Sequence, residues 1–135
     1  MKKFVKVLAL TLVLVMSVAM LASCGAPNKD PEKALEALKE NEYTAAKDST
    51  IIPVALALVG VKDIDCVVSG TAKIDDKLEH VTIIYFEDKD AAEAAWEKVQ
   101  EYAEDKKSDE DTDWVIKKSG AMIYYGTSAG VKAAK

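Results

Sequence analysis

Apolar and polar residues alternate most regularly in the middle of the chain, where they predict a β-hairpin. The even-numbered positions from Ile64 to Ile74 are mostly apolar, and this period of two predicts a strand with one buried face. The segment Glu79–Phe86 is rich in β-branched and aromatic residues and predicts the strongest strand of the chain. Residues 75–77 predict the turn that joins the two strands.

Apolar residues at helical spacing predict a helix on each side of this hairpin. Asp30 followed by Pro31 is typical of a helix start, and the apolar positions that follow predict a helix to about Asn41. The residues Asp-Ala-Ala-Glu at 90–93 form a capping box. They predict a second helix that continues to about Tyr102.

Two segments between the first helix and the hairpin have weaker patterns. Residues 43–47 predict a short strand after Asn41, because asparagine tolerates the left-handed end of a helix. Residues 52–59 are apolar on all sides, and periodicity alone cannot separate a buried helix from a buried strand there. The capping residues at 48–50 and Gly60 after the run favour a helix.

The last part of the chain completes an α+β pattern. It predicts two strands, Trp114–Lys117 and Ala121–Tyr125, joined by a tight turn at 119–120, and a short helix from Thr127. After the N-terminal helix, the predicted order is strand, helix, strand, strand, helix, strand, strand. This order is similar to the ferredoxin-like plan, in which helices cover one face of an antiparallel sheet. We therefore predict an α+β, ferredoxin-like fold with an additional N-terminal helix.

The start of the chain has the three parts of a bacterial lipoprotein signal peptide. Three lysines lie at its head, and an uncharged apolar run over 7–21 follows. This run is slightly shorter than the roughly 20 residues that a spanning helix needs. It closes in a lipobox, formed by Leu21, Ala22, Ser23 and Cys24. Such a cysteine is joined to diacylglycerol through a thioether, and the chain is cut before it.

Three regions are therefore predicted along the chain. Residues 1–23 form the signal peptide, residues 24–29 a short lipidated tether, and residues 30–135 a single α+β domain. The mature protein is then extracytoplasmic and held on the cell membrane by the lipid on Cys24. An uncleaved membrane helix is the alternative, which the small residues before Cys24 disfavour.

The charge balance changes which partners are expected. The whole chain has a formal net charge of −5, and all 18 of its cationic residues are lysines. Three of them lie in the leader, so a chain that begins at Cys24 has 15 lysines, 23 acidic residues and a net charge of −8. Nucleic-acid binding needs a positive surface and often uses the forked arginine side chain. DNA and RNA are therefore not expected as partners, and the acidic surface favours solubility.

Cys66 is the second cysteine of the chain. A lipidated Cys24 cannot form a disulfide, which leaves Cys66 as a single thiol. One interpretation is a reactive thiol. The favoured interpretation is a small buried apolar residue, because Ile64 and Val68 share its face of the predicted strand.

His80 is the only histidine, and no second histidine or free cysteine lies at ligand spacing from it. In the strand pattern it shares a face with Thr82 and Ile84. A solvent-facing or packed histidine is favoured over a catalytic one. Three serines lie outside any Gly-x-Ser-x-Gly motif: Ser69, Ser119 and Ser128.

Other motifs are incomplete. Three aspartates have the spacing that opens an EF-hand loop: Asp109, Asp111 and Asp113. The sixth position is Trp114 rather than glycine, and the twelfth is Gly120 rather than an acid. Residues 126–132 fail the phosphate-loop spacing, so helix capping explains them better. Five aromatic residues are expected in the core rather than in a pocket or on a carbohydrate-stacking face: Tyr85, Trp96, Trp114, Tyr124 and Tyr125. No metal or cofactor is predicted.

Four features occur together in this chain: the lipobox, the helix 31–41 leading to Asn-Glu-Tyr, the passage 85–92 and the segment 119–127. In these features the sequence resembles a group of small lipoproteins of unknown function from Gram-positive bacteria. The resemblance covers most of the chain and implies a location and a one-domain fold, with no active site to transfer.

Function is predicted only as a class. The favoured prediction is a non-catalytic binding module at the cell surface, whose open sheet face or neighbouring cleft docks a protein or small ligand. One alternative is a small hydrolase-type enzyme, for which His80, Cys66 and the acidic residues are the candidate groups. Another is a solute-binding accessory of a transporter, which one domain of this length disfavours because such proteins usually need two lobes.

Overall fold

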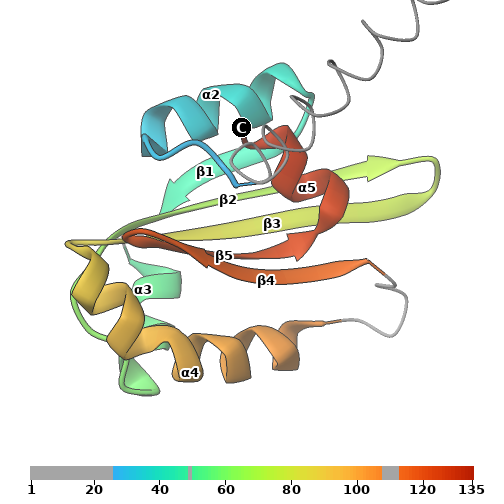
Figure 1. Ribbon diagram of the computed structural model, residues 1–135. Helices are drawn as coiled ribbons and strands as arrows, with labels where there is room; N and C mark the ends of the chain where they lie inside the picture. The colour runs from blue at the N-terminus through green and yellow to red at the C-terminus, as the bar shows by residue number, and fades with distance from the viewer. Residues whose placement is uncertain (1–25, 49, 108–112) are drawn as a thin grey trace, which may run out of the picture.

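The computed structural model describes residues 26–48, 50–107 and 113–135. These residues form an α+β fold with one open, antiparallel five-stranded sheet and four helices (Figure 1). The elements are, in chain order, α2 (Pro31–Glu40), β1 (Thr44–Asp48), α3 (Ile51–Leu58), β2 (Ile64–Ile74), β3 (Lys77–Phe86), α4 (Lys89–Lys106), β4 (Trp114–Ser119), β5 (Met122–Thr127) and α5 (Ser128–Ala133).

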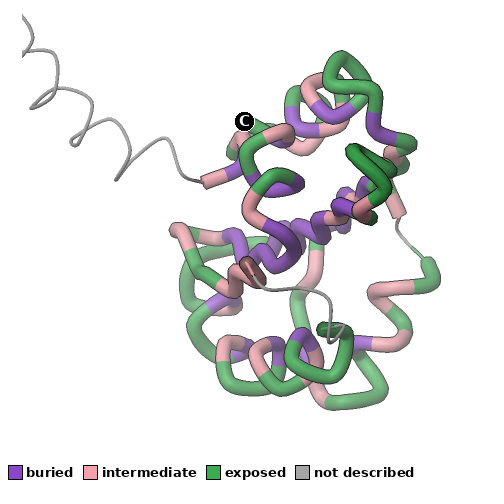
Figure 2. Tube along the Cα trace, turned by 90° about the vertical axis from the view of Figure 1, so that its right-hand side faces the viewer, coloured by how far each residue is buried: buried purple, intermediate pink, exposed green. Residues whose placement is uncertain are grey.

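Helices cover both faces of the sheet, which corrects the prediction that they cover one. Helices α2 and α5 lie on one face, and α3 and α4 lie on the other (Figure 1). The central strands are apolar on both sides: Val67 and Val68 are adjacent in β2, face opposite cores and are both fully buried. Figure 2 shows the buried residues concentrated along the strands between the two helical layers. A sheet that is apolar on both faces needs a cover on both.

The strand order is β1-β2-β3-β5-β4, and the ferredoxin-like order is not confirmed. In that plan, a helix between two strands is a crossover that joins parallel strands. Here α3 lies between β1 and β2 in the chain, yet these two strands are adjacent and antiparallel. Helix α3 instead packs beneath the two strands that it connects.

A β-bulge interrupts β2 near its start. Ile64 is opposite Phe86 and Cys66 is opposite Tyr85, so Asp65 is an extra residue in the ladder. The bulge reverses the alternation, and Ile64 packs on the α4 side while Cys66 is in the core under α2. The expectation that Ile64 shares the face of Cys66 is therefore wrong.

The helix starts agree with the sequence at α2 and differ at α4. Asp30 is the N-cap of α2, and its side chain accepts a hydrogen bond from the Glu32 N–H at 3.0 Å. Helix α4 begins two residues earlier than predicted, because Asp88 rather than Asp90 is its N-cap and accepts the Ala91 N–H at 2.8 Å. The sequence pattern favoured Asp90, because Ala91, Ala92 and Glu93 follow it directly as in a capping box.

Candidate functional site

The two residues with the most reactive side chains lie on opposite faces of the sheet. Cys66 belongs to the core under α2 and α5. His80 is on β3, where alternation directs it with Thr82 and Ile84 to the α4 face, as predicted. A sheet therefore separates the thiol from the imidazole, and a Cys–His catalytic pair between them is excluded by this geometry.

The environment of Cys66 is that of a structural residue. The side chain is 4% exposed and packs in an apolar core. Burial, followed by the charge of Asp65, raises the pKa of the thiol above its usual value. A nucleophilic cysteine needs the opposite shift, toward the thiolate. The favoured interpretation, a buried apolar residue, is confirmed.

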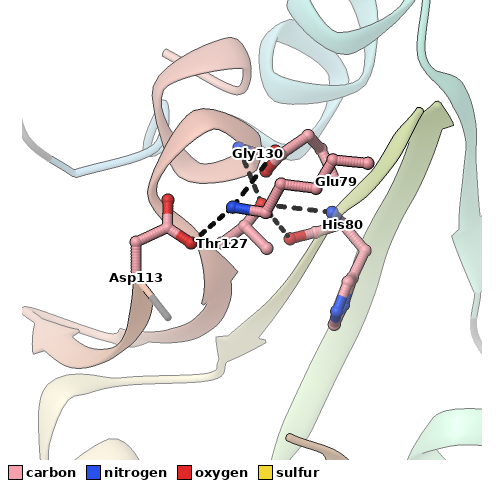
Figure 3. A network of polar contacts seen from close by, with 6 residues as sticks. Glu79, His80, Asp113, Thr127 and Gly130 are labelled. Carbon is pink, nitrogen blue, oxygen red and sulfur yellow. Dashed lines mark hydrogen bonds and ion pairs between the residues drawn. The ribbon is translucent and has the colours of Figure 1, made fainter. Parts of the chain in front are cut away.

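His80 packs against aromatic side chains. Its ring centroid is 4.9 Å from that of Trp114, which in turn is 5.9 Å from that of Tyr125. The partly buried ring points away from the polar network on its own backbone (Figure 3). The structure therefore agrees with a packed histidine.

The three serines lie on three different elements of the fold. Ser69 is on β2, Ser119 ends β4, and Ser128 is the first residue of α5. Ser69 shares the α4 face with His80 at a diagonal cross-strand position, since Thr71 is opposite His80. Such diagonal residues have Cα atoms roughly 7–8 Å apart, a separation that long side chains can span.

A polar network joins α5 to β3 around Thr127 (Figure 3). The fully buried Thr127 hydroxyl oxygen accepts the Gly130 N–H at 3.2 Å and the His80 N–H at 3.2 Å, and it lies 3.3 Å from the His80 carbonyl oxygen, to which it donates. A Cβ at Gly130 would approach the His80 carbonyl to 2.5 Å, and one at Gly126 would approach it to 2.2 Å. The two glycines are thus required by close backbone packing, and the segment 126–132 is a helix cap, as predicted.

The same region contains a buried carboxylate. The Lys77 ammonium lies 3.2 Å from a carboxylate oxygen of Asp113 and 3.7 Å from Oε1 of Glu79. Glu79 is 6% exposed, and its Oε2 and the Tyr43 hydroxyl are buried without a hydrogen-bond partner. Tyr43 has a raised pKa, because of burial first and the Glu79 charge second.

Within the described part of the chain, no group of three or more metal-ligating side chains is close enough to bind an ion. Asp113 pairs with Lys77, while Asp109 and Asp111 lie outside the described residues.

The tyrosines are part of the two cores, as expected. Tyr85 and Tyr124 face α2 and α5, whereas Tyr125 faces α4, and each is about 95% buried. Burial raises the pKa of Tyr125 to about 12. Trp96 and Trp114 are partly buried at the margin of the α4 core, and the Lys118 ammonium lies over the Trp96 ring. These aromatic residues do not form one stacking face.

The most unusual surface lies on α3, which the sequence predicted as a buried element. It is a helix, as favoured, but Leu56 is its only buried residue. Ile51, Val54 and Leu58 are 77%, 55% and 84% exposed. Their spacing of three and four residues places them in one stripe on the side opposite Leu56. We call these three side chains the α3 stripe.

The α3 stripe was missed because an unbroken apolar run carries no signal of which side faces water. Its eight residues contain no charged or hydrogen-bonding side chain. A polar outer side is the usual mark of a surface helix, so its absence indicated burial. Only the short length of the run indicated that few of its side chains could face the sheet.

The described chain begins on the sheet face opposite to α3. Ala26 packs against the core that α2 and α5 cover. The Asn28 N–H donates to the Ala134 carbonyl at 2.9 Å, and the Tyr85 hydroxyl donates to the Asn28 carbonyl at 2.7 Å. The lipobox residues Leu21, Ala22, Ser23 and Cys24 lie outside the described residues. In the described part, no helix is both long and apolar enough to cross a membrane.

Comparison with known proteins adds no relative. The chain matches no protein-family model, no curated protein and no solved structure.

Proposed function

We propose that the protein is a lipid-anchored, extracytoplasmic docking module, which binds a protein partner through the α3 stripe. The observation that carries this proposal is the exposure of three large aliphatic side chains on one side of α3. A contiguous apolar patch on a small domain marks an interaction site more often than a scattered exposed leucine does.

The position of the stripe supports a partner outside the bilayer. A lipid on Cys24 would be two residues from Ala26, which packs on the α2 and α5 face. The α3 stripe is on the other face of the sheet, and its side chains are directed away from the sheet. An anchored domain therefore presents α3 away from the membrane, where a second protein can reach it.

The surroundings of Cys66 and His80 favour binding over catalysis. The thiol is buried with a raised pKa, and the histidine lies on the other face of the sheet against Trp114. The hydrolase-type alternative retains one candidate pair, Ser69 and His80, which occupy diagonal cross-strand positions on the α4 face.

Site-specific photocrosslinking in cells tests the docking surface. A photoreactive residue at Leu58 in the full-length protein is expected to capture one discrete partner. The matched control is Leu78, an exposed leucine (58%) in the β2–β3 hairpin. Adding Ile51→Lys to the Leu58 probe is expected to abolish the adduct, since both residues belong to the stripe. Equal adducts at both leucines, or adducts that survive Ile51→Lys, would contradict the proposal.

Membrane anchoring has its own test. Cys24→Ala is expected to abolish both the lipid mass and membrane retention of the mature chain. Unchanged fractionation and mass would show that Cys24 is not the anchor.

A further inference from the structure

We propose that the protein binds a free α-amino acid with an aliphatic side chain, in a hollow at the end of the sheet beside the start of α2. Asp65 and Lys29 both line this hollow. The ammonium of the amino acid is held by the Asp65 carboxylate, and its carboxylate by the Lys29 ammonium. The hollow is separate from the α3 stripe, and the proposal does not depend on the lipid anchor.

The antiparallel topology brings four strand ends together at this end of the sheet, on the left in Figure 1. Strand β2 begins and β3 ends there, beside the turn that joins β4 to β5. Lys29 and Pro31, at the start of α2, complete the lining. Parts of the chain that are distant in sequence therefore enclose one hollow of about 260 Å³.

Lys29 belongs to a segment that is held against the fold. The backbone N–H of its neighbour Asn28 donates to the Ala134 carbonyl at 2.9 Å, and the Asn28 carbonyl accepts the Tyr85 hydroxyl at 2.7 Å. The Asn28 side chain accepts the Asp30 N–H at 3.0 Å. The backbone is thus fixed on both sides of Lys29. A lysine carries its charge and three rotatable donors on a flexible stem, which suits it to a small anionic group.

Asp65 is placed by the bulge in β2. It is the extra residue of that bulge, between the pairs that Ile64 and Cys66 make with β3. A bulge re-aims a side chain, and bulges are frequent beside functional sites. The bulge therefore takes Asp65 out of the alternation of the strand, and its side chain lines the hollow.

Two opposite charges thus line one small hollow without neutralising each other. Among the described residues, neither the Lys29 ammonium nor the Asp65 carboxylate makes an ion pair or a side-chain hydrogen bond. Lys47 of the neighbouring strand is engaged by Glu32 at 2.9 Å. A zwitterion between Lys29 and Asp65 makes two charge-assisted contacts, whereas a cation or an anion alone makes one.

The rest of the hollow sets the size and side chain of the ligand. Pockets for drug-sized ligands have volumes of about 300–1,000 Å³, so this hollow suits a smaller molecule. At about 30 Å³ per molecule of liquid water, it has the volume of about nine waters, similar to an aliphatic amino acid. Phe86 and Met122 give it apolar lining, which suits an aliphatic side chain. An aminophosphate lipid headgroup has the same two charges but no apolar group beside them.

Calorimetric titration of the full-length protein in detergent micelles with L-leucine tests the site. We expect saturable binding of one leucine per chain. N-acetyl-L-leucine and L-leucine amide each retain one of the two charges, and each is expected to bind at least tenfold more weakly. Absence of leucine binding, or equal affinity for the three compounds, would overturn the proposal. Binding of O-phosphoethanolamine in preference to leucine would overturn it in favour of a lipid headgroup.

Two variants assign the two charges. Asp65→Asn is expected to lower the affinity for leucine at least tenfold while leaving that for N-acetyl-L-leucine unchanged. Lys29→Gln is expected to do the same for leucine relative to L-leucine amide. The matched controls are Asp75→Asn in the β2–β3 turn and Lys33→Gln on α2, two exposed charges outside the hollow. An Asp65→Asn chain that still prefers leucine to its N-acetyl derivative would overturn the assignment.

The two proposals fail separately. Ile51→Lys is expected to leave the affinity for leucine unchanged while removing the adduct at Leu58. Asp65→Asn is expected to leave that adduct unchanged. Loss of leucine binding in Ile51→Lys, with binding intact in Asp65→Asn, would place the ligand at α3 and overturn the site at Asp65 and Lys29.

Discussion

The two faces of the sheet are closed in different ways. On one face, α2 and α5 are held by packing and by polar contacts, including those of Thr127 and Tyr85. On the other face, α3 and α4 pack mainly through apolar side chains. Helix α2 has charged residues outside and apolar residues inside, while α3 is apolar throughout and leaves most of its surface in water. Apolar composition therefore does not locate the core here; position relative to the sheet does.

Truncating a leucine on each face gives the largest contrast. Leu38 in α2 is fully buried, and Leu58 in α3 is 84% exposed. Leu38→Ala is expected to lower the free energy of unfolding by about 3 kcal/mol, from lost apolar burial and a cavity. Leu58→Ala is expected to change it by less than about 0.5 kcal/mol. Urea unfolding of the two variants measures this difference, and equal losses would remove the distinction between the faces.

Removing the Thr127 hydroxyl tests the polar contacts that join α5 to β3. Thr127→Val keeps the shape of the side chain but leaves the His80 and Gly130 N–H groups without this acceptor. A loss of about 2 kcal/mol in unfolding free energy is expected, because buried donors lose their partner. Thr71→Val, on an exposed position of β2, is the control. A loss confined to less than about 0.5 kcal/mol would show that the network is not required.

The smallest effect is expected at the start of α3. Asp48 accepts the Thr50, Ile51 and Ile52 N–H groups, and these bonds, led by that of Ile52, lower the pKa of its carboxyl below its usual 3.8. A lowered pKa stabilises the fold above about pH 4, and this stability is lost as the pH falls through the folded-state value. Asp48→Ala is therefore expected to cost about 1 kcal/mol near neutral pH and progressively less below pH 4. Thermal unfolding across pH measures the difference, and a cost independent of pH would contradict this cause.

Much of the fold was predictable from local signals. The bounds of β2 and the cap at Asp30 follow from alternation and from residue types that act over a few positions. Strand order and the side on which each helix packs depend on contacts between distant segments. Val67 and Val68 are consecutive apolar residues in β2. This succession already departed from the pattern of a strand with one buried face.

The candidate surface was harder to predict than the fold. Sequence reasoning favoured a buried Cys66, which the structure confirms. For His80 it favoured a solvent-facing or packed side chain, and in the structure the ring lies against Trp114. It did not predict the exposed α3 stripe, because exposure of an apolar helix depends on how much sheet lies beneath it. The bulge at Asp65 was also absent from the pattern, since one inserted residue changes only the register.

The hydrogen bonds at Asn28 have a mechanical consequence. If the chain is pulled by a lipid at Cys24, force enters the fold where Asn28 is held by Ala134 and Tyr85. The load then passes to α5 and to β3, a central strand that is paired on both sides. Helix α3 lies on the opposite face of the sheet, outside the path of this load. Tension at the membrane would thus be borne by the sheet while α3 stays unloaded.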